Sequence, residues 1–255
     1  MKVKRIQAIE DYIHAQGTVS LDDLCEHFNV SKNTIRRDIN KIVETNRIKK
    51  VYGGVVSVLS NENELLPFEN RDITNHLEKE EIGSLASQLI ENDDLIFIDS
   101  GTTTRYLVQH IPAAKNVTII TNNLDVINLA SKMDNIKIIV IGTTLKHRTK
   151  SFVGVENWSF FDKYNVTKAF MAATAFSYEQ GVMNSDNLEY EIKKRMMNKA
   201  SKKILMVDHN KAGKSALLTY GALADFDYLV TSSTLPDAYQ DYCEKHDVEI
   251  MTSAK

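Results

Sequence analysis

The feature that most constrains the fold is a pair of helical segments near the N-terminus, separated by only two residues. Residues 21–28 have helical apolar spacing, and residues 31–45 form the second segment. In this second segment Ile35, Ile39 and Ile42 repeat at helical spacing, whereas Lys, Asn and Arg occupy the opposite face. Two helices joined so closely, with the second one apolar inside and basic outside, are typical of a DNA-binding helix-turn-helix.

The neighbouring segments complete a larger pattern. Ser20 and Ser31 stand where they can cap the two helices. A preceding helix has an inward stripe made of Ile6, Ile9 and Ile13. Residues 48–51 and 55–58 flank a glycine pair, which is typical of a two-stranded hairpin. Three helices and such a hairpin predict a winged helix-turn-helix over residues 1–57.

The outward positions of the second helix carry side chains that suit DNA. Arg can bond both acceptors of guanine in the major groove, and Asn can do likewise for adenine. The N-terminal turn of such a helix enters the groove deepest, which favours base contacts from Lys32, Asn33, Arg36 and Arg37. Residues expected to contact phosphates are Thr34, Lys41, Lys49, Lys50 and Tyr52. Ser31 and Asn40 complete the predicted DNA-binding set.

The competing interpretation is a solvated basic helix face within some other helical domain. A polar face alone favours that interpretation, but the two caps, the tight connection and the hairpin together favour DNA binding. One small domain makes too few contacts for tight specific binding. We therefore expect a symmetric assembly, a homodimer or a homotetramer.

Charge is distributed unevenly along the chain. Residues 1–57 hold ten Lys and Arg against seven Asp and Glu, whereas the remainder holds twenty-one against twenty-seven. A basic first domain on an acidic body suits phosphate contacts made by one end only. Cys25, Cys243 and the seven His form no metal-binding spacing, so we expect no metal and no cofactor. We expect a cytoplasmic protein, because neither a signal peptide nor an apolar stretch of about 20 residues is present.

Beyond residues 58–75, which lose periodicity and are interpreted as a linker, the pattern changes. Short apolar runs occupy residues 95–98, 117–120, 136–141, 168–171, 204–207 and 228–230. Helical segments occupy residues 78–91, 103–109, 124–132, 188–200 and 237–246. This alternation predicts an α/β domain over residues 76–255, with a mostly parallel sheet wrapped by helices.

A polar loop follows the first of these strands. Asp99 ends the strand, and Ser100, Gly101, Thr102, Thr103 and Thr104 lead into a predicted helix. Free amides at a helix start, a glycine and several hydroxyls can hold a phosphate. An ordinary capped turn rich in Thr is the alternative.

Other polar residues are expected nearby. Asn122 and Asn123 close the next strand, and ligands of open parallel sheets bind at the carboxyl ends of strands. Further candidates for a ligand phosphate are Lys146, Arg148, Lys150, Ser151 and Gly154. A solvated basic loop is the competing interpretation for the three cations. Glu189 and Lys193, four residues apart on a helix, have the spacing of a surface ion pair.

Several of these segments resemble a known family. They are Arg5, Ile9 and Ile13, the run Ser-Lys-Asn-Thr-Ile-Arg-Arg-Asp-Ile at 31–39, and Val-Tyr-Gly-Gly at 51–54. They resemble the signature of the DeoR family of bacterial transcriptional regulators. The resemblance implies a winged helix that binds operator DNA, and a larger C-terminal domain that senses sugar phosphates and is similar to ribose-5-phosphate isomerase.

Further segments resemble one branch of the family, the repressors of myo-inositol catabolism in Gram-positive bacteria. They are residues 67–71, 97–104, 188–195 and 217–220. The resemblance implies a sequence-specific repressor of a carbohydrate catabolic operon, with myo-inositol as the carbohydrate. It also implies release from the operator by a phosphorylated sugar or sugar acid.

The similarity to the isomerase also bears on catalysis. Lys193 and Lys211 fall where those enzymes have downstream lysines, but Ala-Ala-Thr-Ala occupies residues 172–175, where they have an acidic cluster. Isomerisation of a sugar phosphate needs a carboxylate base, so this departure predicts a pocket that binds without turnover and a protein that is not an enzyme. Three carboxylates stay open as bases from another direction: Glu179, Asp186 and Glu189. The alternative functions are an isomerase-like enzyme fused to a DNA-binding domain, and an activator or protein-binding winged helix.

Overall fold

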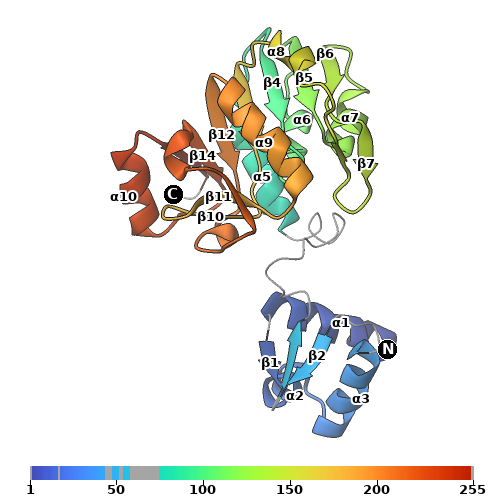
Figure 1. The fold of residues 1–255 in the computed structure, drawn as a ribbon. Coiled ribbons are helices and arrows are strands. Elements are labelled where there is room, and N and C mark those ends of the chain that lie inside the picture. Colours follow the sequence, from blue (N-terminus) through green and yellow to red (C-terminus); the bar gives the residue numbers. More distant parts are fainter. Residues whose placement is uncertain (1, 17, 44–47, 52–53, 58–74, 254–255) are drawn as a thin grey trace. The chain divides into compact units, whose positions relative to one another are not determined.

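A computed structural model of the chain describes residues 2–16, 18–43, 48–51, 54–57 and 75–253. The chain divides into two compact units, residues 1–64 and 65–255. Both are drawn in Figure 1, and each is described here by itself. Except for Asn75, the predicted linker at residues 58–75 lies outside the described residues.

The N-terminal unit contains three helices and a small sheet. Its elements are α1 (Lys2–Gln16), β1 (Thr18–Ser20), α2 (Leu21–Phe28), α3 (Lys32–Val43), β2 (Ile48–Val51) and β3 (Gly54–Ser57). Ile9, Leu24, Ile35, Ile39 and Val55 are almost completely buried in one shared core. The predicted winged helix-turn-helix is confirmed. The sheet has a third strand, however, because β1 pairs with β3 in antiparallel register.

Local hydrogen bonds fix the two helices of the motif. Ser20 caps α2 with a capping box, in which the Asp23 amide donates to Ser20 Oγ over 3.0 Å. Asn29 ends the helix in the left-handed conformation, at φ 50°. Asp38 of α3 is buried, and its Oδ2 accepts a hydrogen bond from Arg5 Nε at 2.9 Å and lies 2.8 Å from Arg5 Nη2. This ion pair ties α3 to α1.

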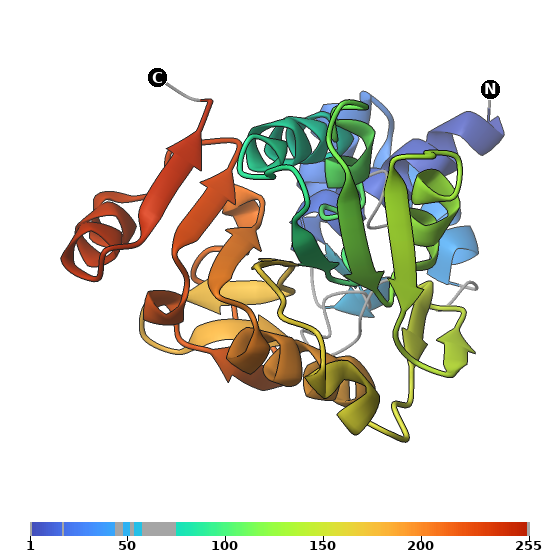
Figure 2. The ribbon, with the colours of Figure 1, turned by 90° about the horizontal axis from the view of Figure 1, so that it is seen from above.

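The C-terminal unit is built around a seven-stranded parallel sheet of order β15-β14-β12-β9-β4-β5-β6. Its strands are β4 (Leu95–Ile98), β5 (Val117–Thr121), β6 (Ile136–Val140), β9 (Lys168–Met171), β12 (Lys202–Met206), β14 (Tyr228–Thr231) and β15 (Glu249–Thr252). Figure 2 shows these strands side by side, from green through orange to red. The predicted α/β class with a mostly parallel sheet is confirmed.

Helices and smaller sheets complete this unit. The helices are α5 (His76–Ser87), α6 (Tyr106–Gln109), α7 (Leu124–Ala130), α8 (Ser159–Asp162), α9 (Asn187–Lys199) and α10 (Asp237–Lys245), with the 3-10 turns η2 (His209–Lys211) and η3 (Leu223–Asp225). A hairpin joins β7 (Thr144–Lys146) to β8 (Ser151–Val153), and an antiparallel sheet contains β10 (Ala175–Ser177), β11 (Gly181–Asn184) and β13 (Leu218–Gly221).

The large sheet separates two apolar layers. Alternate residues of a strand face opposite sides, so Ile96 and Ile98 of β4 pack with α5, α6 and α7. Phe97, between them, packs on the other side with Ile192 and Met196 of α9. Buried polar residues follow the carboxyl ends of β4 and β5, at 99–104 and 122–123.

Several predicted helix ends were wrong. The helix predicted at 78–91 ends at Ser87, because the next residues form i→i+3 bonds, such as Gln88 N to Leu85 O at 3.2 Å. The helix predicted from residue 103 begins at Tyr106. The strands β7, β8, β10, β11, β13 and β15 were not predicted.

Candidate functional site

The predicted DNA-binding side chains of α3 face away from the core of the N-terminal unit. The exposed ones are Ser31, Lys32, Asn33, Arg36, Arg37, Asn40 and Lys41. Ile35, Ile39 and Ile42 are buried on the opposite side. Helical spacing thus separates an apolar face from a basic one, as the sequence predicts.

Two predicted residues have structural bonds at the start of this helix. Ser31 Oγ accepts from the Thr34 amide at 3.3 Å and lies 3.0 Å from Thr34 Oγ1. Ser31 therefore caps α3, and Thr34 is half-buried. Tyr52 and the side chain of Lys49 lie outside the described residues.

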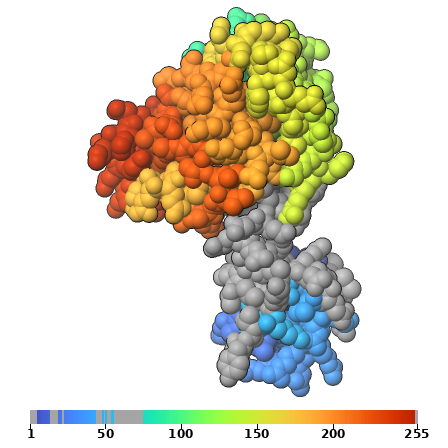
Figure 3. Space-filling model, in the orientation of Figure 1, coloured from blue at the N-terminus to red at the C-terminus, as the bar shows by residue number. Residues whose placement is uncertain are grey.

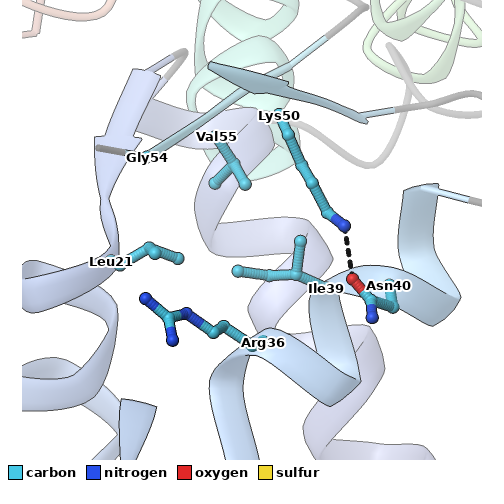
Figure 4. A pocket seen from close by; sticks show the side chains of 7 residues that line it. All are labelled: Leu21, Arg36, Ile39, Asn40, Lys50, Gly54 and Val55. Carbon is cyan, nitrogen blue, oxygen red and sulfur yellow. Dashed lines mark hydrogen bonds between the residues drawn. The ribbon is translucent and has the colours of Figure 1, made fainter. Parts of the chain in front are cut away.

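A hollow of about 300 Å³ lies between α3 and the strands of the wing (Figure 4). The lining residues are Leu21, Arg36, Ile39, Asn40, Lys50, Gly54 and Val55. Lys50 Nζ donates to Asn40 Oδ1 across it, over 2.5 Å. This bond links the wing to the helix.

In the C-terminal unit, the strand order changes direction between β4 and β9. From β4 the chain proceeds to β5 and β6 on one side, then returns to β9, β12, β14 and β15 on the other. Open α/β sheets bind ligands beside such a switch point, at the carboxyl ends of the two strands. The loops after β4 and β9 are the 99–104 and 172–174 segments.

The loop after β4 differs from the predicted helix start. Thr104 Oγ1 donates to Asp99 O over 2.7 Å and lies 3.1 Å from the Gly101 amide, which also bonds Asp99 O. Residues 102–105 form turns, and α6 begins only at Tyr106, so the helix start predicted at residue 103 is wrong, whereas the phosphate site stays a prediction. Ser100 Oγ and Thr103 Oγ1 are buried and have no hydrogen-bond partner among the described residues. Thr102 is buried too.

Gly101 touches the loop after β9. A Cβ at Gly101 would lie 2.3 Å from Ala172 Cβ, so only glycine permits this approach. Asp99 Oδ2 accepts from the Ala172 amide at 2.9 Å, while Asp99 Oδ1 has no partner in the described structure. The alanines at 172–173 therefore leave room for the carboxylate of Asp99.

Lys193 is a buried cation that contacts the loops after β4 and β9. Its Nζ forms an ion pair with Asp99 Oδ2 and donates to Ala172 O at 2.9 Å. Lys193 and Glu189 are both buried, so the surface ion pair that their i, i+4 spacing suggested is wrong. Tyr220 adds a second bond to Ala172 O, at 2.9 Å, and burial raises the pKa of its hydroxyl well above the usual value.

The β7–β8 hairpin is bonded to the start of α9. Lys146 pairs with Asp186, which also caps α9 by accepting from the amides of Leu188 and Glu189. Ser151 Oγ donates to Glu189 Oε1 over 2.6 Å. Figure 3 shows the yellow-green surface of the hairpin beside the orange surface of α9.

Glu189 is a buried carboxyl, 3% exposed. Burial raises the pKa of Glu189 above its usual value, although Lys193 and the Ser151 hydroxyl act in the opposite direction. The sequence left three carboxylates open as catalytic bases. Two of them, Asp186 and Glu189, belong to the bonded group of side chains at the start of α9. Glu179 is exposed in the turn between β10 and β11.

The remaining residues that were predicted to contact the ligand lie in several different loops. Asn123 caps α7 and donates to Gly101 O at 3.1 Å, while Asn122 Oδ1 is buried with no partner among the described residues. Lys211 Nζ donates to Ala173 O at 2.8 Å. The hairpin residues are Arg148, exposed at its tip, Lys150, at φ 49°, and Gly154, whose carbonyl accepts from Thr143.

Two residues that contact these side chains, Tyr220 and Thr149, were not predicted from the sequence. Thr149 Oγ1 lies 2.7 Å from Ser151 Oγ, and Tyr220 lies on the unpredicted strand β13. Only the position of Tyr220 within residues 217–220, which resemble one branch of a family, offered a signal.

No group of three or more His, Cys, Asp or Glu side chains among the described residues has the geometry of a metal site. No helix of the described part has the length and apolar character needed to cross a bilayer.

Solved structures with a partly similar fold include ribose 5-phosphate isomerase A from Methanocaldococcus jannaschii. It is 16% identical, the alignment covers 55% of each chain, and the TM-score is 0.41. A second is translation initiation factor eIF2B delta from Chaetomium thermophilum, at 14% identity, 64% and 57% coverage, and a TM-score of 0.45.

Relatives match over nearly the whole chain. The HTH-type transcriptional regulator IolR of Bacillus subtilis is 53% identical over 98% of this chain and 99% of its own. The glycerol-3-phosphate regulon repressor of Escherichia coli is 28% identical over 98% of both chains. The L-fucose operon activator of Haemophilus influenzae is 26% identical over 96% of this chain and 97% of its own.

Two family profiles cover most of the sequence. The DeoR-like helix-turn-helix domain matches residues 5–61, and the DeoR C terminal sensor domain matches residues 74–233. Together with the relatives, these matches confirm the resemblance found in the sequence. The chain belongs to the DeoR family of transcriptional regulators.

Proposed function

We propose that this regulator is a sequence-specific repressor of a carbohydrate catabolic operon, with myo-inositol as the carbohydrate, and that a phosphorylated sugar or sugar acid releases it from the operator. The observation that carries the proposal is the combination, in one chain, of an exposed basic helix and a loop whose buried hydroxyls have no hydrogen-bond partner among the described residues. The 53% identity to IolR supports the assignment within the family. A transcription assay with purified protein distinguishes a repressor from an activator.

The DNA contacts are proposed for the exposed face of α3 and the wing. Arg36 and Arg37 suit guanine, and Lys32 and Asn33 lie in the first turn, which enters the groove deepest. A symmetric homodimer or homotetramer would place two such helices on an operator with matching half-sites. We further propose that the protein acts in the cytoplasm, where operator DNA is present.

Arg36→Ala should weaken operator binding by about 1–3 kcal/mol, because one bidentate contact to guanine is lost. Fluorescence anisotropy with an operator selected from a random DNA library measures this loss. Gln7→Ala, at an exposed position of α1, is the matched control and should leave binding unchanged. Unchanged affinity of the Arg36 variant would refute the assignment of α3 as the helix that contacts bases.

The effector is proposed to bind at the switch point between β4 and β9. Ser100 Oγ, Thr103 Oγ1 and Asn122 supply neutral polar atoms, and Lys193, which is paired with Asp99, supplies an ammonium donor. Buried polar atoms are costly unless they form hydrogen bonds, so a phosphorylated ligand that satisfies them gains affinity. A thermal-shift screen of sugar phosphates, including intermediates of inositol catabolism, identifies the ligand.

We propose binding without turnover at this switch point. Asp99 is held by Lys193 and the Ala172 amide, and Glu189 is held by Ser151, so both carboxyl groups have structural partners. The named relatives are regulators, which supports the same conclusion. Isomerisation of pentose phosphates by the purified chain, measured against buffer alone, would favour the enzyme instead.

Packing inside the C-terminal unit offers a route for the signal. A Cβ at Gly83 of α5 would lie 2.6 Å from Tyr106 Cβ, so α5 packs directly on the start of α6, the helix after the 100–104 loop. α5 is the first described helix after the predicted linker. A ligand that shifts this loop can therefore bias α5, to the extent of its differential affinity for the two arrangements.

A further inference from the structure

The contact between Lys50 and Asn40 joins two elements that were expected to meet DNA separately. Lys50 belongs to β2 in the wing, and Asn40 belongs to α3. Both side chains are exposed, and Lys50 Nζ lies 2.5 Å from Asn40 Oδ1. Figure 4 shows the lysine reaching down from the wing to the amide oxygen.

The backbone segments that carry Lys50 and Asn40 are held in place by the core. Lys50 pairs with Val55 in the β2–β3 register. Val55 and Ile39 are buried in the core that β3 shares with α3, at 0% and 1% exposure. The distance between the wing backbone and the helix is therefore fixed by core packing, and only the two side chains can adjust.

The chemistry of the two groups fixes the orientation of the amide. An ammonium group has donors only, whereas an amide has an acceptor at Oδ1 and donors at Nδ2. The charge-assisted bond therefore keeps Oδ1 toward Lys50 and turns Nδ2 away from it. Without Lys50, the Asn40 amide could rotate by 180° and exchange its donor and acceptor ends.

We propose that Lys50 is a positioning residue for sequence recognition: it orients Asn40 so that Nδ2 donates to a base acceptor. The acceptors of this kind in the major groove are guanine O6 and N7, thymine O4 and, through one bond only, adenine N7. Adenine is recognised through Oδ1 and Nδ2 together, and here Oδ1 faces the wing. The proposal rests on the proposed role of α3 in base recognition, and it replaces the predicted phosphate contact of Lys50.

The salt dependence of DNA binding distinguishes a lysine that contacts phosphate from a lysine that orients another side chain. A lysine that neutralises a phosphate releases a counterion, so its loss lowers the slope of log Kd against log salt by about 1. A lysine that orients another side chain leaves that slope unchanged and alters base preference instead. Lys41 is the matched control, because it is exposed on the same helix and is predicted to contact phosphate.

The experiment uses the full chain with Lys50→Met, Asn40→Ala, the double variant and Lys41→Met. Binding to the selected operator and to each of its single-base substitutions is measured by anisotropy over a series of KCl concentrations. We expect Lys50→Met and Asn40→Ala to lose preference at the same base pair, by on the order of 10- to 100-fold, with no further loss in the double variant. Lys41→Met should keep the preference and lower the salt slope by about 1.

Two results would overturn the proposal. One is a salt slope lowered by Lys50→Met with base preference retained, which identifies a phosphate contact. The other is a change of preference by Lys50→Met and Asn40→Ala at different base pairs. Failure of the proposed function itself has a different signature, since Arg36→Ala would then also leave operator affinity unchanged.

Discussion

Replacing Lys193 with Met should destabilise the C-terminal unit by about 3–5 kcal/mol, because the substitution leaves the Asp99 carboxylate buried without its ion pair. The two side chains are 3% and 0% exposed. Solvent therefore cannot replace the lost ammonium group. Removal of one partner from so buried a pair is among the costliest changes to a protein core.

The single Trp158 makes this effect measurable for one unit alone. The chain has one tryptophan, and it lies in the C-terminal unit. Guanidinium unfolding followed by its fluorescence therefore reports this unit and not the winged helix. The shift of the transition midpoint gives the change in unfolding free energy.

The matched control is the double variant Asp99→Asn with Lys193→Met. Asparagine at position 99 can still accept from the Ala172 amide through its oxygen, and no buried charge remains. Most of the lost stability should return, since replacing a whole buried pair is often close to neutral. A loss below about 1 kcal/mol in the single variant would show that the pair does not stabilise the fold.

The sequence predicted the winged helix well because its signals are local. The spacing of Ile35, Ile39 and Ile42 specifies the buried face of α3, and capping residues specify both helix starts. The third strand of the wing was not predicted. β1 has only three residues, and the residues of β3 with which they pair lie 34 to 38 positions later in the sequence. Strands that short carry no detectable alternation.

The arrangement of side chains at the switch point was predicted only in part. The polar loop at 100–104 and the carboxyl edge of the sheet follow from the order of strands and from composition. The ionic partners do not, because Lys193 and Asp99 are 94 residues apart, and the i, i+4 spacing to Glu189 is equally typical of a surface pair. Alanines at 172–173 likewise indicate a missing acid until the structure shows Asp99 beside them.

Thr103→Asp should abolish release from the operator by the effector while leaving operator affinity within about twofold of the wild type. Thr103 is 1% exposed in the loop after β4, and its hydroxyl has no hydrogen-bond partner among the described residues. A carboxylate there would repel the phosphate of the ligand at short range in a poorly hydrated site, where charges interact more strongly than in water. Anisotropy with the selected operator, titrated with the sugar phosphate found by the thermal-shift screen, measures the release.

Neutral variants separate charge from folding. Thr103→Val keeps the shape of the side chain without the hydroxyl and without a charge, and it should weaken release by roughly 5- to 10-fold through one lost hydrogen bond. Thr103→Ser keeps the hydroxyl and should respond almost normally. If Thr103→Asp fails to fold, as shown by Trp158 fluorescence, the Val and Ser pair still decides the question. Normal release in the Val variant would place the effector phosphate away from Thr103, since a phosphate bonded to its hydroxyl requires that donor.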